Sequence, residues 1–156
     1  MEALFDLLKK TKSLDNGDVW EKVFKEDNIQ NFVIVELIQE EQLYGQGIDD
    51  TGNPIKDRFT GSTTYSELTE ILSNGRKKEG THYTLLDTGD FYKSMIINVF
   101  KNYIEISADP IKNDDDLFTK YGEGIIGLTE ESKNKLAQKI APRYQFYILQ
   151  YLQRDR

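Results

Sequence analysis

Apolar residues in the first part of the chain recur at helical spacing. Leucines three and four residues apart predict a short helix over 2–13, and a second helical stretch follows at 19–24. The polar segment 13–18, which contains an Asn-Gly pair, separates the two. Residues 1–28 could therefore form a helical arm ahead of the core.

A longer candidate helix covers residues 29–44, IQNFVIVELIQEEQLY. Its β-branched centre is compatible with a strand, but the glutamates and glutamines that flank the centre favour a helix that ends at Gly45 or Gly47. The apolar residues whose spacing supports this helix are Ile29, Phe32, Val33, Leu37 and Tyr44.

Turn-forming residues concentrate in the next segment, 47–64, which predicts a surface loop or a set of short irregular turns. YSELTEILSNG, at 65–75, then predicts one more helix. Ser66 or Thr64 would cap its start and Gly75 would end it.

The pattern changes to strand-like alternation after residue 94. MIINVFKNYIEISA, at 95–108, predicts a β-hairpin with a two-residue loop at Lys101 and Asn102. With that loop Ile97 lies opposite Ile106, and one face of the hairpin is wholly apolar. The residues of that face are Met95, Ile97, Val99, Ile104, Ile106 and Ala108. Because side chains alternate between the two faces of a strand, this agreement supports the register.

The last part of the chain returns to helix. Residues 109–116 predict an acidic loop, and 117–128 a short helical turn followed by extended chain. Thr129, followed by two glutamates, has the features of an N-cap. Pro142 is expected to break or kink the helix that begins there, with an aromatic-rich terminal helix at 142–156.

Together these elements predict one α+β domain over residues 1–156, with N-terminal helices, a small antiparallel sheet and a C-terminal helix. The core is expected at 29–141, and the length suits one domain rather than two. No apolar run approaches the ~20 residues of a membrane span. The first ten residues are too acidic for a secretion signal.

Composition narrows the possible chemistry. The chain has no cysteine, which excludes disulfides, thiolate zinc sites and thiol nucleophiles. His82 is its one histidine, so a multi-histidine metal site within one chain is excluded as well. A net charge of -7 disfavours a general nucleic-acid binder. Nine tyrosines and eight phenylalanines are consistent with an assembling protein, because aromatic residues are enriched at interfaces.

The stretch TLLDTGDFYKSM, at 84–95, looks like the active-site signature of a retroviral-type aspartic protease. Such an enzyme needs two carboxylates that share a proton, and it obtains the second by forming a homodimer. However, Asp90 and Phe91 stand where those enzymes have a small residue, and the interval to the Ile-Ile-Gly element at 125–127 is too short for a flap. The favoured interpretation makes Asp87 a helix cap in a capping box with Asp90. A dimeric protease that uses Asp87 remains the enzymatic alternative.

Acidic segments outside this stretch resemble metal sites only superficially. The segment 49–53, DDTGN, fails the spacing of an EF-hand loop, and the run at 114–116 is typical of solvated surface. No metal ion and no cofactor is therefore expected.

An ordered set of short motifs extends beyond the DTG tripeptide. L-x-x-T-G-x-F-x-x-S leads directly into the predicted hairpin, and LFTKYGEG follows it at 117–124. This order resembles the bacteriophage neck and tail-completion proteins, a family of small virion-morphogenesis proteins, over residues 42–135. A phenylalanine takes the place of the family's usual leucine in the first motif. That motif, together with the two acids inside it, comprises Leu85, Asp87, Thr88, Gly89, Asp90, Phe91 and Ser94.

The resemblance implies a non-enzymatic virion protein that forms or completes a ring at the head–tail junction or upper tail. Its partners would be further copies of itself and the portal, adaptor or tail proteins, without a membrane, and nucleic acid would at most pass through the ring. The chain would be made in the cytoplasm of the bacterial host. A cytoplasmic protein-binding module is a further alternative. The candidate interface residues are Asp49, Asp50, Asn53, Asp114, Asp115, Tyr121, Glu123, Tyr144, Tyr147 and Tyr151.

Overall fold

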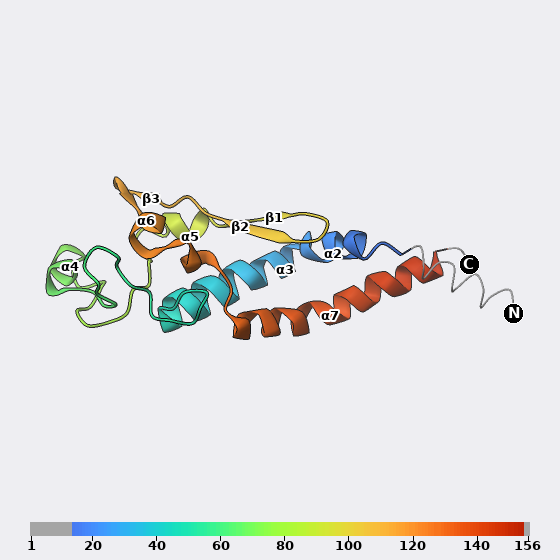
Figure 1. The fold of residues 1–156 in the computed structure, drawn as a ribbon, viewed down its shortest axis with the longest axis horizontal. Coiled ribbons are helices and arrows are strands. Elements are labelled where there is room, and N and C mark those ends of the chain that lie inside the picture. The colour runs from blue at the N-terminus through green and yellow to red at the C-terminus, as the bar shows by residue number, and fades with distance from the viewer. Residues whose placement is uncertain (1–13, 155–156) are drawn as a thin grey trace, which may run out of the picture.

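The computed structural model describes residues 14–154, so the helix predicted over 2–13 lies outside the described residues. The molecule is elongated, with long helices along its length and the strands above them (Figure 1). The helices are α2 (Asn16–Phe24), α3 (Asp27–Asn31), η1 (Phe32–Gln46), α4 (Glu67–Leu72), α5 (Asp90–Lys93), α6 (Leu117–Tyr121), η2 (Glu123–Ile126) and α7 (Glu130–Gln153). The strands are β1 (Ile96–Val99), β2 (Ile104–Ser107), β3 (Ile111–Lys112) and β4 (Asp115–Asp116). The predicted α+β class is confirmed.

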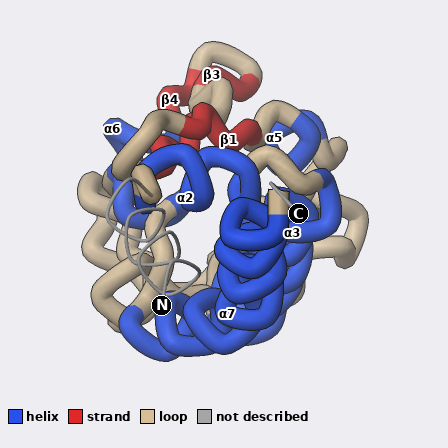
Figure 2. The backbone as a smooth tube through the Cα atoms, turned by 90° about the vertical axis from the view of Figure 1, so that its right-hand side faces the viewer, coloured by secondary structure: helices blue, strands red, loops and turns tan. Residues whose placement is uncertain are grey.

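Viewed end-on, the long helices gather on one side of the molecule and the strands on the other (Figure 2). α2 packs against α7, and α3 continues into η1. The core lies between these layers and includes Phe24, Ile29, Val33, Leu37, Ile38, Leu43, Ile55, Phe91, Met95, Ile97 and Ile125. Since α2 contributes Val23 and Phe24 to the core, the described part of the predicted N-terminal arm belongs to the domain.

The helix predicted over 29–44 is present, but η1 is wound with bonds between residues five apart, as a π-helix. It ends at Gly47, whose left-handed backbone donates its N–H to the Gln42 carbonyl. The wider winding changes which residues face inward. Gln42 and Leu43 are buried, whereas Tyr44 is 58% exposed. The α-helical spacing that placed Tyr44 with the apolar residues is therefore wrong at this end of the helix.

The buried side chain of Gln42 joins η1 to the start of α7 through hydrogen bonds. Its side-chain amide donates to the Gly127 carbonyl at 2.8 Å. Its side-chain oxygen accepts from the Thr129 N–H at 3.1 Å and from the Ser132 hydroxyl at 2.7 Å. Thr129 also caps α7, as predicted, by accepting from the Ser132 N–H. One buried side chain thus fixes where α7 begins relative to η1.

The hairpin of β1 and β2 has the predicted register, with Ile97 opposite Ile106 and Val99 opposite Ile104. Met95 and Ile97 are buried, and the other residues of the apolar face pack against the core. On the opposite face, the rings of Phe100 and Tyr103 stack with centroids 4.6 Å apart. The hairpin therefore covers the helices and packs against the core through its apolar face.

The segment 109–116, predicted as a loop, contains a second small hairpin, β3 and β4, at residues 111–116. Asn113 and Asp114 both have positive φ, 47° and 68°, which is the geometry of a tight hairpin turn. After α6, which matches the predicted helical turn, the chain forms the 3₁₀ helix η2 rather than an extended segment.

α7 runs through Pro142 as one helix, so the predicted break and the separate terminal helix at 142–156 are wrong. Contacts on both sides of the proline hold the helix in place. Leu136 is buried before it, and Arg143 and Tyr147 both bond to Glu26 after it. These contacts offset the backbone bond that proline cannot make.

Candidate functional site

The residues that carry the motif resemblance form a compact turn at the base of the first hairpin. Leu85 is buried although its φ is 56°, an uncommon conformation for leucine. Gly89 precedes α5 with φ of 85°, which explains the need for glycine there. The Thr88 hydroxyl accepts from the Asp90 N–H and donates to the Asp90 carboxylate. The motif threonine therefore organises the first turn of α5.

Phe91 and Ser94 connect this turn to the hairpin. Phe91 is buried and meets Phe118 of α6 edge-on, with centroids 6.4 Å apart. The Ser94 hydroxyl donates to the Phe91 carbonyl at 2.7 Å and accepts from the Asp109 N–H at 2.9 Å. Since Asp109 follows β2, Ser94 ties together the two ends of the hairpin. Each of these motif residues has a structural role.

Asp87 is not the helix cap predicted from the sequence. Its carboxylate lies 2.6 Å from the Lys112 ammonium, 3.5 Å from the Arg76 guanidinium and 3.8 Å from the Lys77 ammonium. These cations come from the segment before the motif and from β3, so only the tertiary structure brings them together. The hydrogen bond from Lys112 is the main cause that lowers the pKa of Asp87, although partial burial opposes it.

The surroundings of Asp87 are strongly basic. The cations of Lys112, Arg76 and Lys77 favour the ionised form of its carboxylate. The carboxylate is therefore placed to anchor β3 to the 76–87 segment.

We expect Asp87→Asn to lower the free energy of unfolding by about 1–2 kcal/mol at pH 7. Because folding lowers the pKa of Asp87 below its usual 3.8, the stabilisation is present above that value and is lost as the pH falls through the folded pKa. Urea denaturation of both proteins across pH 7 to 2 should show the difference closing at the acidic end. A difference that is constant with pH would contradict the ion-pair role.

A cleft of about 650 Å³ opens beside Asp87, between the 57–69 segment, β3–β4 and α6. Tyr65 and Tyr83 meet edge-on along it, and Tyr83 and Tyr121 meet at a tilt, with centroid distances of 4.9 and 5.1 Å. Burial raises the pKa of the Tyr121 hydroxyl above its usual range. The predicted interface residue Tyr121 is therefore part of an aromatic cluster that lines the cleft.

The charges in this cleft balance one another. Lys112 and Lys77 face Asp87, while Lys120 lies 3.9 Å from Asp57 and 3.7 Å from Asp115. The cleft therefore presents no excess of either charge to a ligand. Asp115, a predicted interface residue, lies on its wall, whereas Asp114 forms the exposed turn between β3 and β4.

The predicted interface residues Asp49, Asp50 and Asn53 make hydrogen bonds within their own loop or to η2. Asp49 accepts from the N–H groups of Thr51 and Asn53, which closes the turn. Asp50 donates its N–H to the Gly124 carbonyl, and a Cβ built on that glycine would lie 2.5 Å from the Asp50 carboxylate. The glycine is thus needed for the close approach of the loop to η2.

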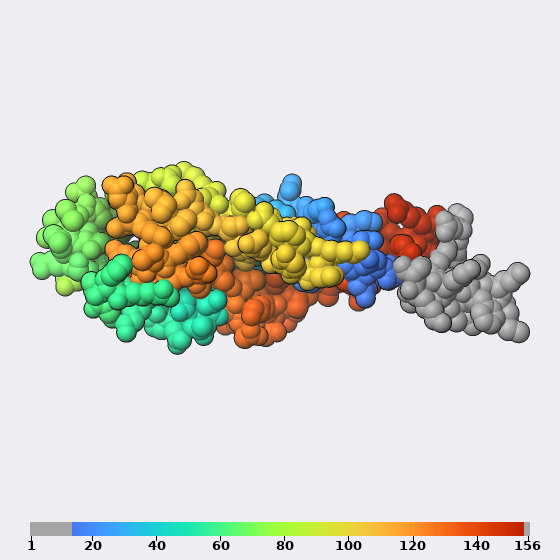
Figure 3. All heavy atoms as spheres, turned by 45° about the horizontal axis from the view of Figure 1, so that its top comes forward, coloured from blue at the N-terminus to red at the C-terminus, as the bar shows by residue number. Residues whose placement is uncertain are grey.

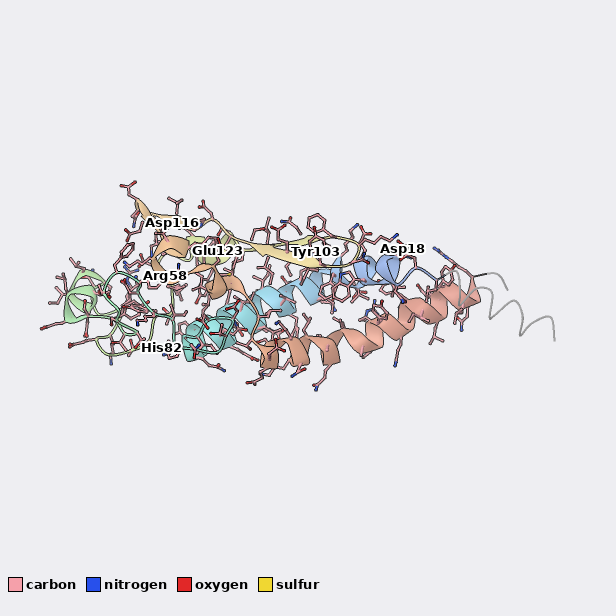
Figure 4. All side chains as sticks on the ribbon, viewed as in Figure 1. Asp18, Arg58, His82, Tyr103, Asp116 and Glu123 are labelled. Carbon is pink, nitrogen blue, oxygen red and sulfur yellow. The ribbon has the colours of Figure 1, made fainter. Side chains whose placement is uncertain are left out.

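Glu123 lies beside this contact at the surface. It lines a shallow hollow together with Arg58 and Asp116, and Figure 4 shows the three labelled side chains in one region. The lone histidine, His82, bonds through Nε2 to the Tyr44 carbonyl at 2.8 Å and pairs in a short bridge with Thr64. His82 therefore has a structural place in a loop.

Two of the three terminal tyrosines bind α7 to the N-terminal helices. The Tyr144 hydroxyl donates to the Asn16 carbonyl at 3.0 Å, and the Tyr147 hydroxyl donates to Glu26 at 2.7 Å. The Arg143 guanidinium pairs with the same carboxylate, and its hydrogen bonds hold the pKa of Glu26 below its usual value. Tyr151 is half-buried near the end of the helix.

Two apolar surfaces are exposed; the sequence interpretation missed the first, whereas the second lies between the predicted interface residues Tyr144 and Tyr151. The α4 patch consists of Leu68, Ile71 and Leu72, which are 64%, 64% and 75% exposed. The α7 stripe consists of Phe146 and Leu149, which are 42% and 55% exposed. Their helical spacing resembles that of core residues, so no local signal places them outside. No residue of α4 is buried, although the helix and its Ser66 cap are as predicted.

The described residues, 14–154, contain neither a cluster of metal ligands nor a helix that could span a membrane. No three histidine, cysteine, aspartate or glutamate side chains of this part of the chain gather closely enough to hold a metal ion. None of the helices described there is long and apolar enough to cross a bilayer.

Comparisons with known proteins return no matching family model, no matching curated protein and no matching solved structure. The resemblance to phage neck proteins therefore rests on the sequence motifs alone.

Proposed function

We propose that this chain is a structural protein of a tailed bacteriophage virion, which forms or completes a ring at the head–tail junction or upper tail. One observation carries the proposal. The chain exposes two different apolar helix surfaces, the α4 patch and the α7 stripe. A ring built from identical subunits in head-to-tail order needs two different contact surfaces on each subunit.

The environment of the motif supports the same function. Thr88, Phe91 and Ser94 make the hairpin a fixed part of the domain, which suits a subunit that presents rigid surfaces to its neighbours. Asp87, the residue on which a protease would depend, is occupied by ion pairs with Lys112 and Arg76.

We expect mass spectrometry of purified virions from the phage or prophage that encodes this chain to detect it at a stoichiometry comparable to that of the portal. Imaging of those particles with an antibody against the chain should label the head–tail junction or upper tail. Its absence from particles in which portal and tail proteins are detected would overturn the proposal.

A peptide-cleavage assay distinguishes the enzymatic alternative, a dimeric protease that uses Asp87, from the proposed structural role. Cleavage by the wild-type chain that disappears in Asp87→Asn would favour a protease. The matched control is Asp90→Asn, because Asp90 is a neighbouring acid whose carboxylate bonds to Thr88 within its own turn.

A further inference from the structure

α4 lies at one end of the long axis of the molecule, and the C-terminal part of α7, which contains the α7 stripe, lies towards the other (Figure 3). Separate surfaces at the two ends can be used at the same time without obstructing each other. Both patches belong to helices, so each offers a ridge of side chains against which a second helix can pack.

The two helices that carry these surfaces have opposite net charges. α4 carries Glu67 and Glu70 in its six residues and no basic residue. In α7 every charged residue after Glu131 and up to Gln153 is basic: Lys133, Lys135, Lys139 and Arg143. This is unusual in a chain with a net charge of -7. Lys133, Lys135 and Arg143 are already paired with glutamates of this chain, so Lys139 is the cation that α7 offers to an acidic surface.

Lys139 links the charge to the stripe. It lies seven residues before Phe146 and ten before Leu149, which places all three on one face of an α-helix. All three are exposed. The Lys139 ammonium lies 4.9 Å from the centre of the Phe32 ring and has no carboxylate within ion-pair distance among the described residues. The stripe therefore has a cation at one end that is open to an acidic partner.

We propose that the α4 patch of one copy docks on the α7 stripe of the next copy. Leu68, Ile71 and Leu72 would cover Phe146 and Leu149, with the glutamates of α4 facing Lys139. This inference rests on the proposed ring and names the surfaces that form its contact. Pairing of like surfaces is disfavoured, because α4 against α4 brings glutamates together and α7 against α7 brings cations together.

The test uses two variants that each disable one surface. Leu72→Glu puts a charge in the α4 patch, and Leu149→Glu puts one in the α7 stripe. Ile111→Glu is the matched control, since Ile111 is 61% exposed and belongs to neither surface. Because all three positions are exposed, thermal melts should match that of the wild-type chain, which verifies folding. Sedimentation velocity is measured over a concentration series for each protein and for an equimolar mixture of the two disabled variants.

We expect the wild-type chain to associate as its concentration rises, and less strongly as salt is added. Each disabled variant should associate at least about tenfold more weakly, because a charge in a buried contact is costly. Their mixture should form a dimer and nothing larger, since Leu72→Glu retains the α7 stripe and Leu149→Glu retains the α4 patch. The control should behave as the wild type does.

Three results would overturn the inference. One is Leu72→Glu alone associating as strongly as the wild type, which would show that the contact does not need the α4 patch. Another is a mixture that stays monomeric while the wild type assembles. The third is a wild-type chain that is monomeric at every concentration, including one that binds vesicles of anionic lipid through α7. If such a monomer is nevertheless found in purified virions, the proposed function stands and only this contact fails.

Discussion

Gln42→Leu is expected to lower the free energy of unfolding by about 3 kcal/mol, because a leucine leaves buried polar groups without partners. The Thr129 N–H and the Gly127 carbonyl both bond to the Gln42 side chain. Leucine fills a similar volume, so the effect isolates the lost hydrogen bonds. Urea denaturation at pH 7 measures it. A loss of this size is a large share of the stability of a domain, which is about 5–15 kcal/mol.

The matched control is Gln46→Leu, at an exposed position of the same helix. It should change stability by no more than about 0.5 kcal/mol. Equal urea midpoints for Gln42→Leu and Gln46→Leu would show that the polar contact between η1 and α7 contributes little.

Phe91→Ala is expected to cost about 3–4 kcal/mol of unfolding free energy, because it opens a cavity in the core. Phe91 is 6% exposed and lies between the motif turn and Phe118 of α6. Its loss should also speed amide hydrogen exchange in β1 and β2, since the turn that contains it leads directly into β1. Hydrogen exchange and urea denaturation together measure both effects.

Two further variants serve as controls for the stability loss of Phe91→Ala. Phe91→Leu, which restores the leucine usual in the family that the motif resembles, should cost only about 1 kcal/mol because most of the volume is kept. Phe59→Ala removes a ring that is 73% exposed and should be near neutral. A Phe91→Ala protein as stable as Phe59→Ala would mean that the motif phenylalanine does not hold the hairpin.

These two positions bear on function as well as stability. Gln42 fixes the start of α7, the helix that carries the α7 stripe, and Phe91 fixes the hairpin. Gln42→Leu and Phe91→Ala should therefore weaken assembly indirectly, by destabilising the domain. The melting temperature of each variant should fall together with its assembly. Leu72→Glu and Leu149→Glu should weaken assembly without any change in melting temperature, which separates contact residues from supporting ones.

Local patterns were sufficient for much of the fold. The β1–β2 register follows from alternation and loop length, because a shift of one residue would turn Ile97 and Ile106 away from the core. The caps at Ser66 and Thr129 also follow from sequence, since an N-cap bonds only to residues two or three positions ahead. The α+β class required nothing more than these elements.

Other features depended on residues far apart in the chain. Asp87 was expected to be a cap because the sequence shows only its neighbours, whereas its cations come from 76–77 and from Lys112. The burial of Gln42 in η1, which is wound as a π-helix, likewise depends on its polar partners at 127–132. No local pattern distinguishes that winding from an α-helix.

The sequence by itself determined the β1–β2 hairpin, the caps at Ser66 and Thr129 and the motif that resembles those of neck proteins, because each depends on residues close together in the chain. Only the tertiary structure decided that Asp87 is an ion-pair centre and that Gln42 is buried. It also decided that Leu68, Ile71 and Leu72 face outward. An apolar residue at helical spacing has the same local pattern whether its own chain covers it or leaves it exposed, and only the arrangement of distant segments distinguishes the two.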